Sequence, residues 1–284
     1  MKQLFNYICS QLQDKYSDSE TRELAYWILE ETTGLSRAQI IIGCKDTKNN
    51  ANTQAFSDFH THTIENIVQK LREHMPIQYI FGHTSWMGLD LLVSPDTLIP
   101  RPETAELVEW IILKCSTNMR AHVLDIGTGS GCIAIALKQR APLWLVTGLD
   151  ISSQALLIAQ QNASRNNVQV NWRVADILNT TPTQKFDIIV SNPPYICDCE
   201  KNQMHARVLE YEPHKALFVP DNDPLLFYRR IALFKAPKLF FEINEAYGQE
   251  VCQMMLEAGY KHVELKNDIY GKPRMVFGTI MRQS

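Results

Sequence analysis

The sequence predicts an α/β protein in which a small helical region precedes a larger sheet domain. Apolar residues recur at helical spacing as far as about residue 76. From residue 122 onward, short apolar runs rich in β-branched residues alternate with helical patterns, which is typical of a parallel α/β sheet. We therefore expect a helical domain over residues 1–76, a linking β-hairpin over 77–97 and the sheet domain over 98–284.

Length and composition narrow the class of protein. A chain of 284 residues accommodates one or two domains, and its net charge of −3 gives no general attraction to nucleic acid. The seven cysteines are odd in number and scattered, which is typical of a reducing compartment, and no His/Cys cluster predicts a metal site. No segment approaches the ~20 apolar residues of a membrane span, so we expect a cytoplasmic protein without membrane contact.

Four helices are expected in the N-terminal domain. Ser17 with Glu20 forms a capping-box pattern, and Gly34 is a plausible end for the same helix. Residues 45–54 are polar and predict a loop. The apolar stripes that mark the helices run from Leu4 to Tyr16, from Leu24 to Ile28, from Ser36 onward and from Phe59 to Leu71.

The linker region contains two glycines and a stiff proline loop. Residues 78–81 and 89–93 flank Gly82 and Gly88 and predict a β-hairpin. The segment Leu98–Thr104 follows, with prolines on both sides of Arg101, and Pro102 stands where a first-turn proline opens a helix. Taken alone, Arg101 is typical of a solvated loop charge.

Seven strands are expected in the sheet domain, over residues 122–126, 145–149, 168–174, 186–190, 239–243, 263–265 and 275–280. Helices are expected after the first strand through Leu137, after a cap at Ser152, and over 225–234 and 248–256. Residues 196–215 are polar without a clear period, and we expect them to form a flap over the site.

The motif Asn192-Pro193-Pro194-Tyr195 directly follows the strand over residues 186–190. Open α/β sheets bind ligands at the carboxyl ends of their strands. There the Asn192 side chain and the Pro193 carbonyl offer two acceptors to one planar NH₂ group, and Tyr195 offers a flat face. Asn-Pro-Pro is also a common turn sequence, but its place after a buried strand favours a site.

A glycine loop, Gly127-Thr128-Gly129-Ser130-Gly131, follows the first strand. A dinucleotide fingerprint would need a glycine at 132, where this chain has cysteine, so the spacing argues against NAD. Asp150 ends the second strand and is suited to ribose hydroxyls, and Asp176 ends the third and is suited to an adenine amino group. Each acid alone is more typical of a cap, but together they predict an adenosine-shaped pocket.

An adenosine pocket beside an NH₂ pocket suits transfer of a methyl group from a cationic donor. An amide nitrogen is planar and a poor nucleophile. The carbonyl oxygens of Asn192 and Pro193 would accept its two hydrogens and direct its lone pair at the methyl carbon. Because charge develops on nitrogen in the transition state, these acceptors would bind that state more tightly than the ground state.

With these motifs the chain resembles the class I S-adenosylmethionine-dependent methyltransferases. More narrowly, it resembles the bacterial peptide-chain release factor N5-glutamine methyltransferases, the HemK/PrmC family, over essentially its whole length. The segments that carry the resemblance are Pro76–Gly82, Leu98–Thr104, Leu124–Gly131 and Ser191–Ile196. The Ile-Pro-Arg-Pro-Glu-Thr run makes the narrower assignment specific, because Asn-Pro-Pro-Tyr also resembles amino-methyltransferases of nucleic acids.

The resemblance implies a Rossmann-like, mixed seven-stranded sheet with helices on both faces. It implies a cytoplasmic, monomeric enzyme that uses S-adenosyl-L-methionine, releases S-adenosyl-L-homocysteine and methylates the glutamine of the Gly-Gly-Gln motif in release factors, with no nucleic-acid substrate. The helical domain would dock the protein substrate. The implied cofactor residues are Gly127, Thr128, Gly129, Ser130, Gly131, Asp150, Asp176, Ile177 and Asn192. The implied catalytic residues are Asn192, Pro193 and Tyr195, and the implied substrate residues are these with Pro194, Arg101 and Glu103.

Three positions depart from the family pattern. Ala105 replaces a usual glutamate, with Glu106 one place later, and Ile177 stands where relatives often have an aromatic ring. Residues 235–238 replace a usual Gly-Gly turn. Two alternatives stay open at this point: an amino-methyltransferase of nucleic acid, and a non-catalytic adaptor that has kept the fold.

Overall fold

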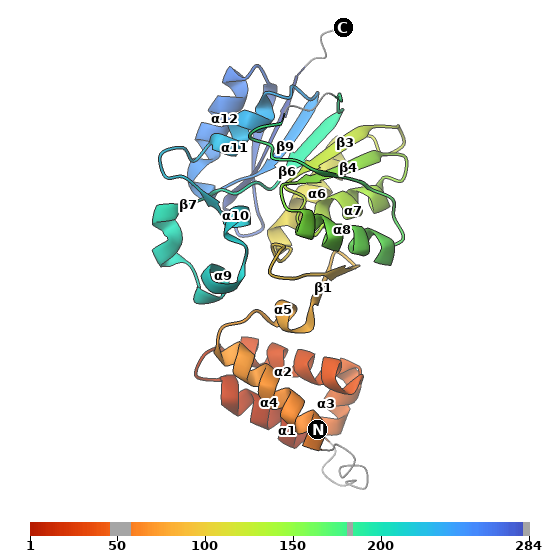
Figure 1. Cartoon of the computed structure of the whole chain (residues 1–284), viewed down its shortest axis with the longest axis vertical. Helices are drawn as coiled ribbons and strands as arrows, with labels where there is room; N and C mark the ends of the chain where they lie inside the picture. The colour runs from red at the N-terminus through yellow and green to blue at the C-terminus, as the bar shows by residue number, and fades with distance from the viewer. Residues whose placement is uncertain (46–57, 181–183, 281–284) are drawn as a thin grey trace. The chain divides into compact units, whose positions relative to one another are not determined.

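The computed structural model describes residues 1–45, 58–180 and 184–280 of the chain. The chain divides into two compact units, Met1–Phe81 and Gly82–Ser284 (Figure 1). Within the described residues no helix has both the length and the apolar character needed to cross a bilayer.

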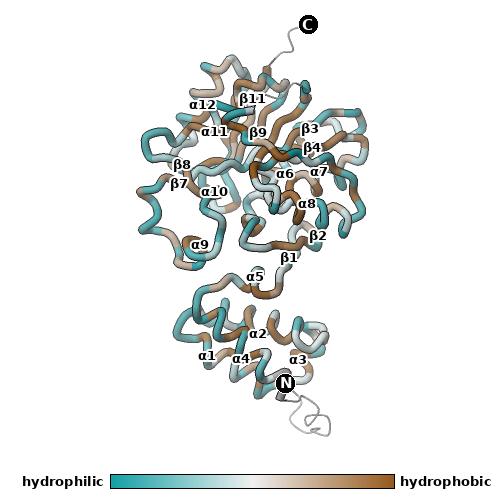
Figure 2. The backbone as a smooth tube through the Cα atoms, in the orientation of Figure 1, coloured by the Kyte–Doolittle hydropathy of each residue, from teal (hydrophilic) through white to brown (hydrophobic). Residues whose placement is uncertain are grey.

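The first unit is built from helices, as the sequence predicts. They are α1 (Lys2–Leu12), α2 (Asp18–Thr33), α3 (Arg37–Lys45), α4 (Asp58–Arg72) and the short α5 (Ile77–Phe81). The Ser17 hydroxyl accepts the backbone N–H of Glu20, and Gly34 ends α2 in the left-handed conformation, which confirms both caps. Hydrophobic and hydrophilic stretches alternate along these helices (Figure 2), and the apolar ones share one core. The predicted loop over 45–54 falls, beyond Lys45, outside the described residues.

The predicted hairpin exists, but its first strand lies later than expected. Residues 78–81 belong to α5, and the strands are β1 (His83–Trp86) and β2 (Leu89–Leu92). The prediction was wrong here because the turn is Met87-Gly88, both with positive φ, and a two-residue turn of this kind fixes which residues pair. Pro76 instead accepts the first helical hydrogen bonds of α5.

The second unit contains the expected mixed seven-stranded sheet. Its strands are β3 (His122–Ile126), β4 (Leu145–Asp150), β5 (Asn171–Val174), β6 (Ile188–Ser191), β9 (Lys238–Glu242), β10 (Lys261–Asn267) and β11 (Pro273–Thr279). The strand order is β10-β11-β9-β6-β3-β4-β5, and β11 pairs antiparallel with both of its neighbours. The third strand starts three residues later than predicted, because its pairing with β4 begins only at Asn171.

Helices cover both faces of this sheet (Figure 1). One apolar cluster joins the sheet to α6 (Pro102–Lys114), α7 (Cys132–Arg140) and α8 (Ser153–Arg165); the other joins it to α11 (Leu226–Ala232) and α12 (Gly248–Glu257). A short 3₁₀ helix, η3 (Glu245–Tyr247), precedes α12.

The segment after β6 is ordered, although the sequence shows no period there. It contains β7 (Ile196–Cys197), the 3₁₀ helix η2 (Asp198–Gln203), α9 (Ala206–Tyr211), α10 (His214–Leu217) and β8 (Phe218–Val219). Strands β7 and β8 pair with each other, so the segment leaves the sheet and returns as one closed excursion. These elements are too short for periodicity to reveal them.

A buried asparagine ties the hairpin to the sheet domain. Asn162 of α8 has no solvent exposure. Its side-chain oxygen accepts the Leu92 N–H at 2.6 Å, and its Nδ2 donates to the carbonyls of Leu92 at 3.0 Å and Ser130 at 2.8 Å. Asn162 therefore connects the hairpin, α8 and the glycine loop.

We predict that Asn162→Ala lowers the free energy of unfolding by about 2–4 kcal/mol, because it leaves buried backbone groups of Leu92 and Ser130 unpaired. Urea denaturation measures this. The control is Asn166→Ala, which removes solvent-exposed bonds to the Asp90 backbone and a bond to the Asn162 carbonyl, and it should cost less than about 1 kcal/mol. Equal losses in the two variants would contradict the role given to Asn162.

Candidate active site

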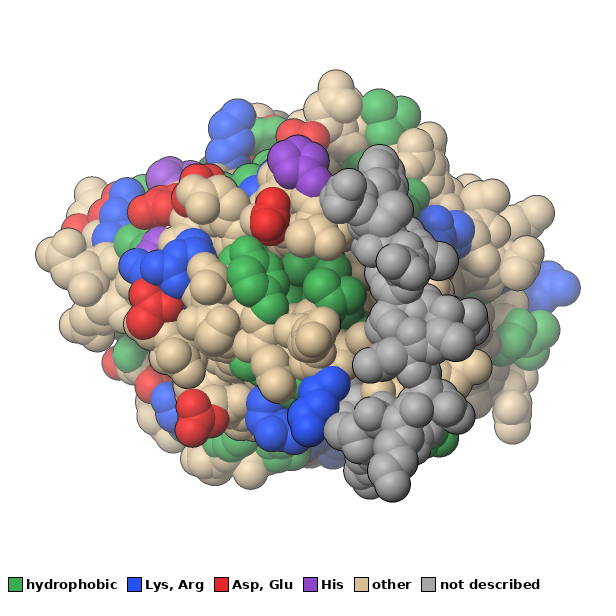
Figure 3. Space-filling view, turned by 90° about the horizontal axis from the view of Figure 1, so that it is seen from below, with side chains coloured by type: hydrophobic (Ala, Val, Ile, Leu, Met, Phe, Trp, Pro, Cys, Tyr) green, Lys and Arg blue, Asp and Glu red, His purple; other side chains and the backbone are tan. Residues whose placement is uncertain are grey.

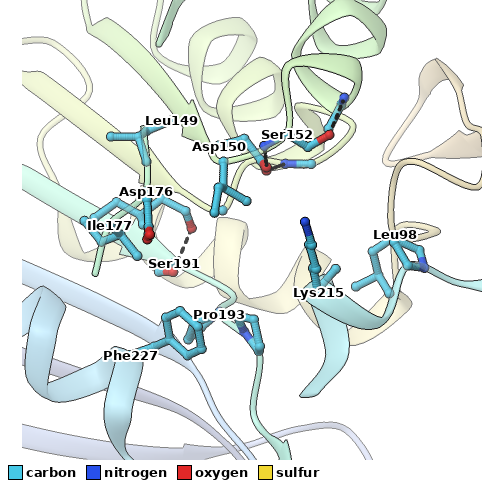
Figure 4. Close-up of a pocket in the computed structure, with 18 of the residues that line it drawn as sticks. Leu98, Leu149, Asp150, Ser152, Asp176, Ile177, Ser191, Pro193, Lys215 and Phe227 are labelled. Atoms are coloured by element: carbon cyan, nitrogen blue, oxygen red, sulfur yellow. Dashed lines mark hydrogen bonds between the residues drawn. The ribbon is translucent and has the colours of Figure 1, made fainter. Parts of the chain in front are cut away.

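A cavity of about 680 Å³ opens at the carboxyl ends of β3, β4, β5 and β6 (Figure 4). The chain continues from β3 to β4 and β5 on one side, and β6 then pairs with β3 on its other side. The strand order therefore reverses at β3, and α/β sheets bind ligands at such a switch point. The volume is typical of small-molecule sites. The predicted residues at its wall are Gly127, Gly129, Asp150, Asp176, Ile177, Asn192, Pro193 and Pro194.

The glycine loop follows β3 and needs glycine for conformation and for space. Gly127, Gly129 and Gly131 all have positive φ. A Cβ on Gly131 would lie 2.9 Å from the Trp172 ring, so the loop packs tightly on the sheet. Gly127 and Gly129 line the cavity, and a side chain on Gly129 would enter open space. The predicted cofactor residues Thr128, Ser130 and Gly131 lie behind this wall, with the two hydroxyl residues buried.

Asp150 ends β4 and faces the cavity between two backbone donors. Its Oδ2 accepts the Gly129 N–H at 2.8 Å, and its Oδ1 accepts the Ser152 N–H at 2.9 Å (Figure 4). Burial raises the pKa of the Asp150 carboxyl, and these donors oppose that shift. The carboxylate keeps lone pairs for ligand hydroxyl groups, as expected for a ribose site.

Asp176 and Ile177 line the next part of the wall. Asp176 accepts the Leu178 N–H at 2.9 Å and the Asn179 side-chain N–H at 2.6 Å, so it also shapes its own turn. Ile177 is buried and offers no ring, but Phe227 of α11 lines the same cavity (Figure 4). The sequence analysis missed Phe227, because nothing in its helix distinguishes it from a core residue.

The Asn-Pro-Pro motif leaves β6 beside the glycine loop. A Cβ on Gly127 would lie 3.8 Å from the backbone oxygen of Asn192. The Asn192 Nδ2 donates to the Thr104 hydroxyl at 3.3 Å. No donor from the described residues reaches Asn192 Oδ1 or the Pro193 carbonyl oxygen. Two acceptors at the cavity wall are therefore available to a ligand.

Tyr195, Arg101 and Glu103 do not line the cavity. The Tyr195 hydroxyl donates to Glu242 Oε1 at 3.4 Å, and burial raises its pKa. The Arg101 guanidinium contacts both carboxylate oxygens of Glu212 at 2.7 Å. Glu212 directly follows α9, and the next residues, Pro213–Ala216, line the cavity. Through Glu212, Arg101 therefore holds a segment of the cavity wall.

Two buried acids were missed by the sequence analysis. Asp125 of β3 and Glu242 of β9 are 0% and 1% exposed. Asp125 Oδ2 accepts the Thr128 hydroxyl at 2.5 Å and the Ala134 N–H at 3.2 Å, while its Oδ1 has no partner among the described residues. Burial raises the pKa of each carboxyl to about 7. The available signal was an acid inside an otherwise apolar strand.

This arrangement fits S-adenosylmethionine. The open space over Gly129 admits a ligand close to backbone, Asp150 suits ribose hydroxyls, and Ile177 with Phe227 forms an apolar wall suited to a base. Among the described residues, no group of three or more His, Cys, Asp or Glu side chains is placed to hold a metal ion.

The fold and the cavity together define a methyltransferase of the class I type. Residues 108–216 match the Methyltransferase small domain family, and residues 3–82 match the PrmC N-terminal domain family. A methyltransferase from Pyrococcus furiosus has a TM-score of 0.50 at 17% identity, covering 74% of this chain and 98% of that one. The hMettl16 catalytic domain in complex with the MAT2A 3'UTR hairpin 6 has a TM-score of 0.52 at 13% identity, covering 77% and 93%. At these identities the likeness shows the fold alone.

Sequence relatives identify the family. The chain is 44% identical over 271 residues to the release factor glutamine methyltransferase of Flavobacterium psychrophilum, covering 92% of each chain. It is 43% identical over 284 residues to that of Bacteroides thetaiotaomicron, covering 97% of this chain and 99% of the other. The chain belongs to the release factor glutamine methyltransferase family, which confirms the resemblance.

We predict that Asp125 makes folding stability fall as pH rises from about 4 to 7. Its pKa is about 7 in the folded protein against an ordinary value of 3.8, so the folded state binds the proton more tightly. The resulting stabilisation is complete below pH 3.8 and is lost as pH rises through 7, with a limiting slope of about 1.4 kcal/mol per pH unit.

Urea denaturation between pH 5 and 8 tests this by comparing wild type with Asp125→Asn. The wild-type free energy of unfolding should decline relative to that of the variant up to pH 7 and then run parallel to it. Other titrating groups act in both proteins and cancel. Parallel curves over the whole range would contradict the prediction.

Proposed function

We propose that this chain transfers a methyl group from S-adenosyl-L-methionine to the side-chain amide nitrogen N5 of the glutamine in the Gly-Gly-Gln motif of peptide chain release factors, and so modulates translation termination. The observation that carries the chemistry is the pair of free acceptors, Asn192 Oδ1 and the Pro193 carbonyl, at the cavity wall. Membership of the family supports the substrate.

The residues proposed for the donor surround the cavity floor. The glycine loop with Gly127 and Gly129, Asp150, and the corner of Asp176 and Ile177 would hold it. When bound, the donor supplies a methyl carbon made electrophilic by a sulfonium, and it leaves as S-adenosyl-L-homocysteine. The protein therefore needs to supply orientation and charge stabilisation rather than a nucleophile of its own.

The two acceptors act on the glutamine amide. A planar amide has little density on nitrogen. Accepting both hydrogens at Asn192 and Pro193 orients the NH₂ group and stabilises the positive charge that develops as the N–C bond forms. As the N–C bond forms, the S–C bond of the sulfonium breaks, and the cationic nitrogen then releases one proton to solvent water. Pro194 keeps the corner rigid, and we assign Tyr195 to support its far side.

We infer that the helical unit docks the release factor, that Arg101 and Glu103 shape the rim that meets the peptide, and that the enzyme is a cytoplasmic monomer. A protein substrate rather than nucleic acid is supported by the net charge of −3, and basic and acidic side chains are interspersed on the face drawn in Figure 3.

We predict that Asn192→Ala retains donor binding and loses at least about 100-fold in kcat, because the lost acceptor acts mainly in the transition state. Calorimetry measures binding. Mass spectrometry of a release factor incubated with enzyme and donor locates the methyl group, and an RNA arm tests the alternative substrate class. Asn166→Ala is the control outside the cavity. Methylation of RNA alone would overturn the substrate, and full activity of Asn192→Ala would overturn the mechanism.

A truncated chain tests the docking role. We predict that residues 82–284 bind the donor with the affinity of the full chain, because the cavity and two apolar clusters lie wholly in that unit. Methylation of a folded release factor should be lost. Calorimetry and a radiolabelled methyl assay measure the two properties, and circular dichroism confirms the fold. Unchanged methylation by the truncated chain would show that the helical unit does not dock the substrate.

A further inference from the structure

A buried chain of polar side chains runs behind the Asn-Pro-Pro corner. Asn192 Nδ2 contacts Thr104 Oγ1 at 3.3 Å, and Thr104 Oγ1 contacts Glu242 Oε2 at 2.7 Å. The Tyr195 hydroxyl reaches the other carboxylate oxygen, Oε1, at 3.4 Å. Thr104 and Glu242 are 2% and 1% exposed and come from α6 and β9.

The protons available on these side chains determine which group donates and which accepts in each hydrogen bond. A threonine hydroxyl has one proton to donate and two lone pairs that accept. A carboxylate only accepts, so the Thr104 proton belongs to Glu242 Oε2. The Thr104 oxygen then accepts from Asn192, which places the Asn192 NH₂ group toward Thr104 and its Oδ1 on the other side of the amide.

A reversed Asn192 amide would be penalised in this setting. Its Oδ1 would face the Thr104 oxygen with no proton between them, and its NH₂ group would face the glutamine NH₂, donor against donor. The site would then lose one of its two acceptors for the substrate.

We propose that Thr104 and Glu242 are positioning residues that fix the orientation of the Asn192 amide, so that its oxygen faces the substrate nitrogen. This inference rests on the proposed function, which supplies the NH₂ group to be held. It assigns a role to the threonine of the Pro-Glu-Thr segment and to the acid that ends β9, neither of which contacts the substrate.

The groups around Glu242 determine the pH range in which its carboxyl is ionised and can accept the Thr104 proton. Burial disfavours the Glu242 carboxylate most strongly, and the negative charge of Glu103 on α6 adds to this effect. The Thr104 hydroxyl and Arg274 of the neighbouring strand β11 favour the carboxylate. Tyr195, Tyr228 and Cys132 also face this group, and the Tyr228 hydroxyl donates to the Glu242 backbone carbonyl at 3.4 Å. The balance raises the pKa of Glu242 to about 7.

Protonation of Glu242 would reverse the direction of these hydrogen bonds. A neutral acid donates to Thr104, which releases the threonine proton toward Asn192 and stabilises the reversed amide. Turnover should therefore rise with pH through about 7, as Glu242 loses its proton.

The first test distinguishes the role of the Thr104 hydroxyl from that of the side-chain volume. Thr104→Val keeps the volume and should lower kcat by about 10- to 100-fold, a loss typical of misplaced catalytic groups, with donor affinity unchanged. Thr104→Ser restores the hydroxyl and should recover most of kcat. The matched control is Thr147→Val, a buried threonine of β4 outside the cavity. If Thr104→Val turns over like wild type, the proposal is wrong.

The second test replaces Glu242 by a side chain that does not ionise. Glu242→Gln still offers a carbonyl acceptor to Thr104 but does not ionise near pH 7, so the acidic limb of the kcat profile should flatten. The double variant with Thr104→Val should be no slower than Thr104→Val alone, because the residues act as one chain. An acidic limb that persists in Glu242→Gln, or additive losses in the double variant, would overturn the inference.

A third readout is independent of turnover. With ¹⁵N-asparagine labelling, the Asn192 side-chain NH₂ signal should shift with pH through about 7 in wild type and not in Glu242→Gln. If wild type shows this shift but leaves release factors unmethylated, the proposed function is wrong, whereas the positioning role of Thr104 and Glu242 stands. If wild type methylates release factors but the Asn192 signal does not respond to pH or to Thr104→Val, the positioning role is wrong, whereas the proposed function stands.

Discussion

The site depends on the parallel pairing of β6 with β3. Ile126 pairs with Ser191, and the Ser191 hydroxyl donates to the Ile126 carbonyl at 2.7 Å, which locks the last register position. The glycine loop and the Asn-Pro-Pro corner therefore leave the sheet side by side at the same edge. A shift by one residue would turn the Asn192 side chain to the other face of the strand, so register and chemistry are not separable.

Two acidic side chains next to the site are buried, which disfavours their ionised forms. Asp125 beneath the glycine loop and Glu242 behind the corner are both taken out of water, and burial opposes their charge. Apolar residues of similar volume would often be as stable or more so. Both acids instead receive directional donors, from Thr128 of the glycine loop for Asp125 and from Thr104 of α6 for Glu242. The stability given up at these positions maintains geometry in the site.

The sequence was informative where the signal is local. The strand and turn around residue 192, the glycine loop and Asp150 could be placed because apolar runs end at turn residues within a few positions. Contacts between distant segments carry no such signal: Thr104 and Glu242 are 138 residues apart, and Arg101 and Glu212 are 111 apart. The predicted hairpin began too early for a different reason: three apolar residues in a row, Tyr79-Ile80-Phe81, do not distinguish a strand from a helical turn.

Glu106 of α6 follows Ala105 and makes a contact that Ala105 does not make. Successive helical residues point about 100° apart, so Glu106 does not occupy the direction of a side chain at 105. Ala105 packs against the core under the hairpin, while Glu106 Oε1 accepts the Ile269 N–H at 3.1 Å in the turn between β10 and β11. That turn is already held by Asp268, which accepts the N–H groups of Tyr270 and Lys272. Thr104 makes its contact with Glu242 from the preceding position, so neither Ala105 nor Glu106 takes part in the hydrogen bonds behind Asn192.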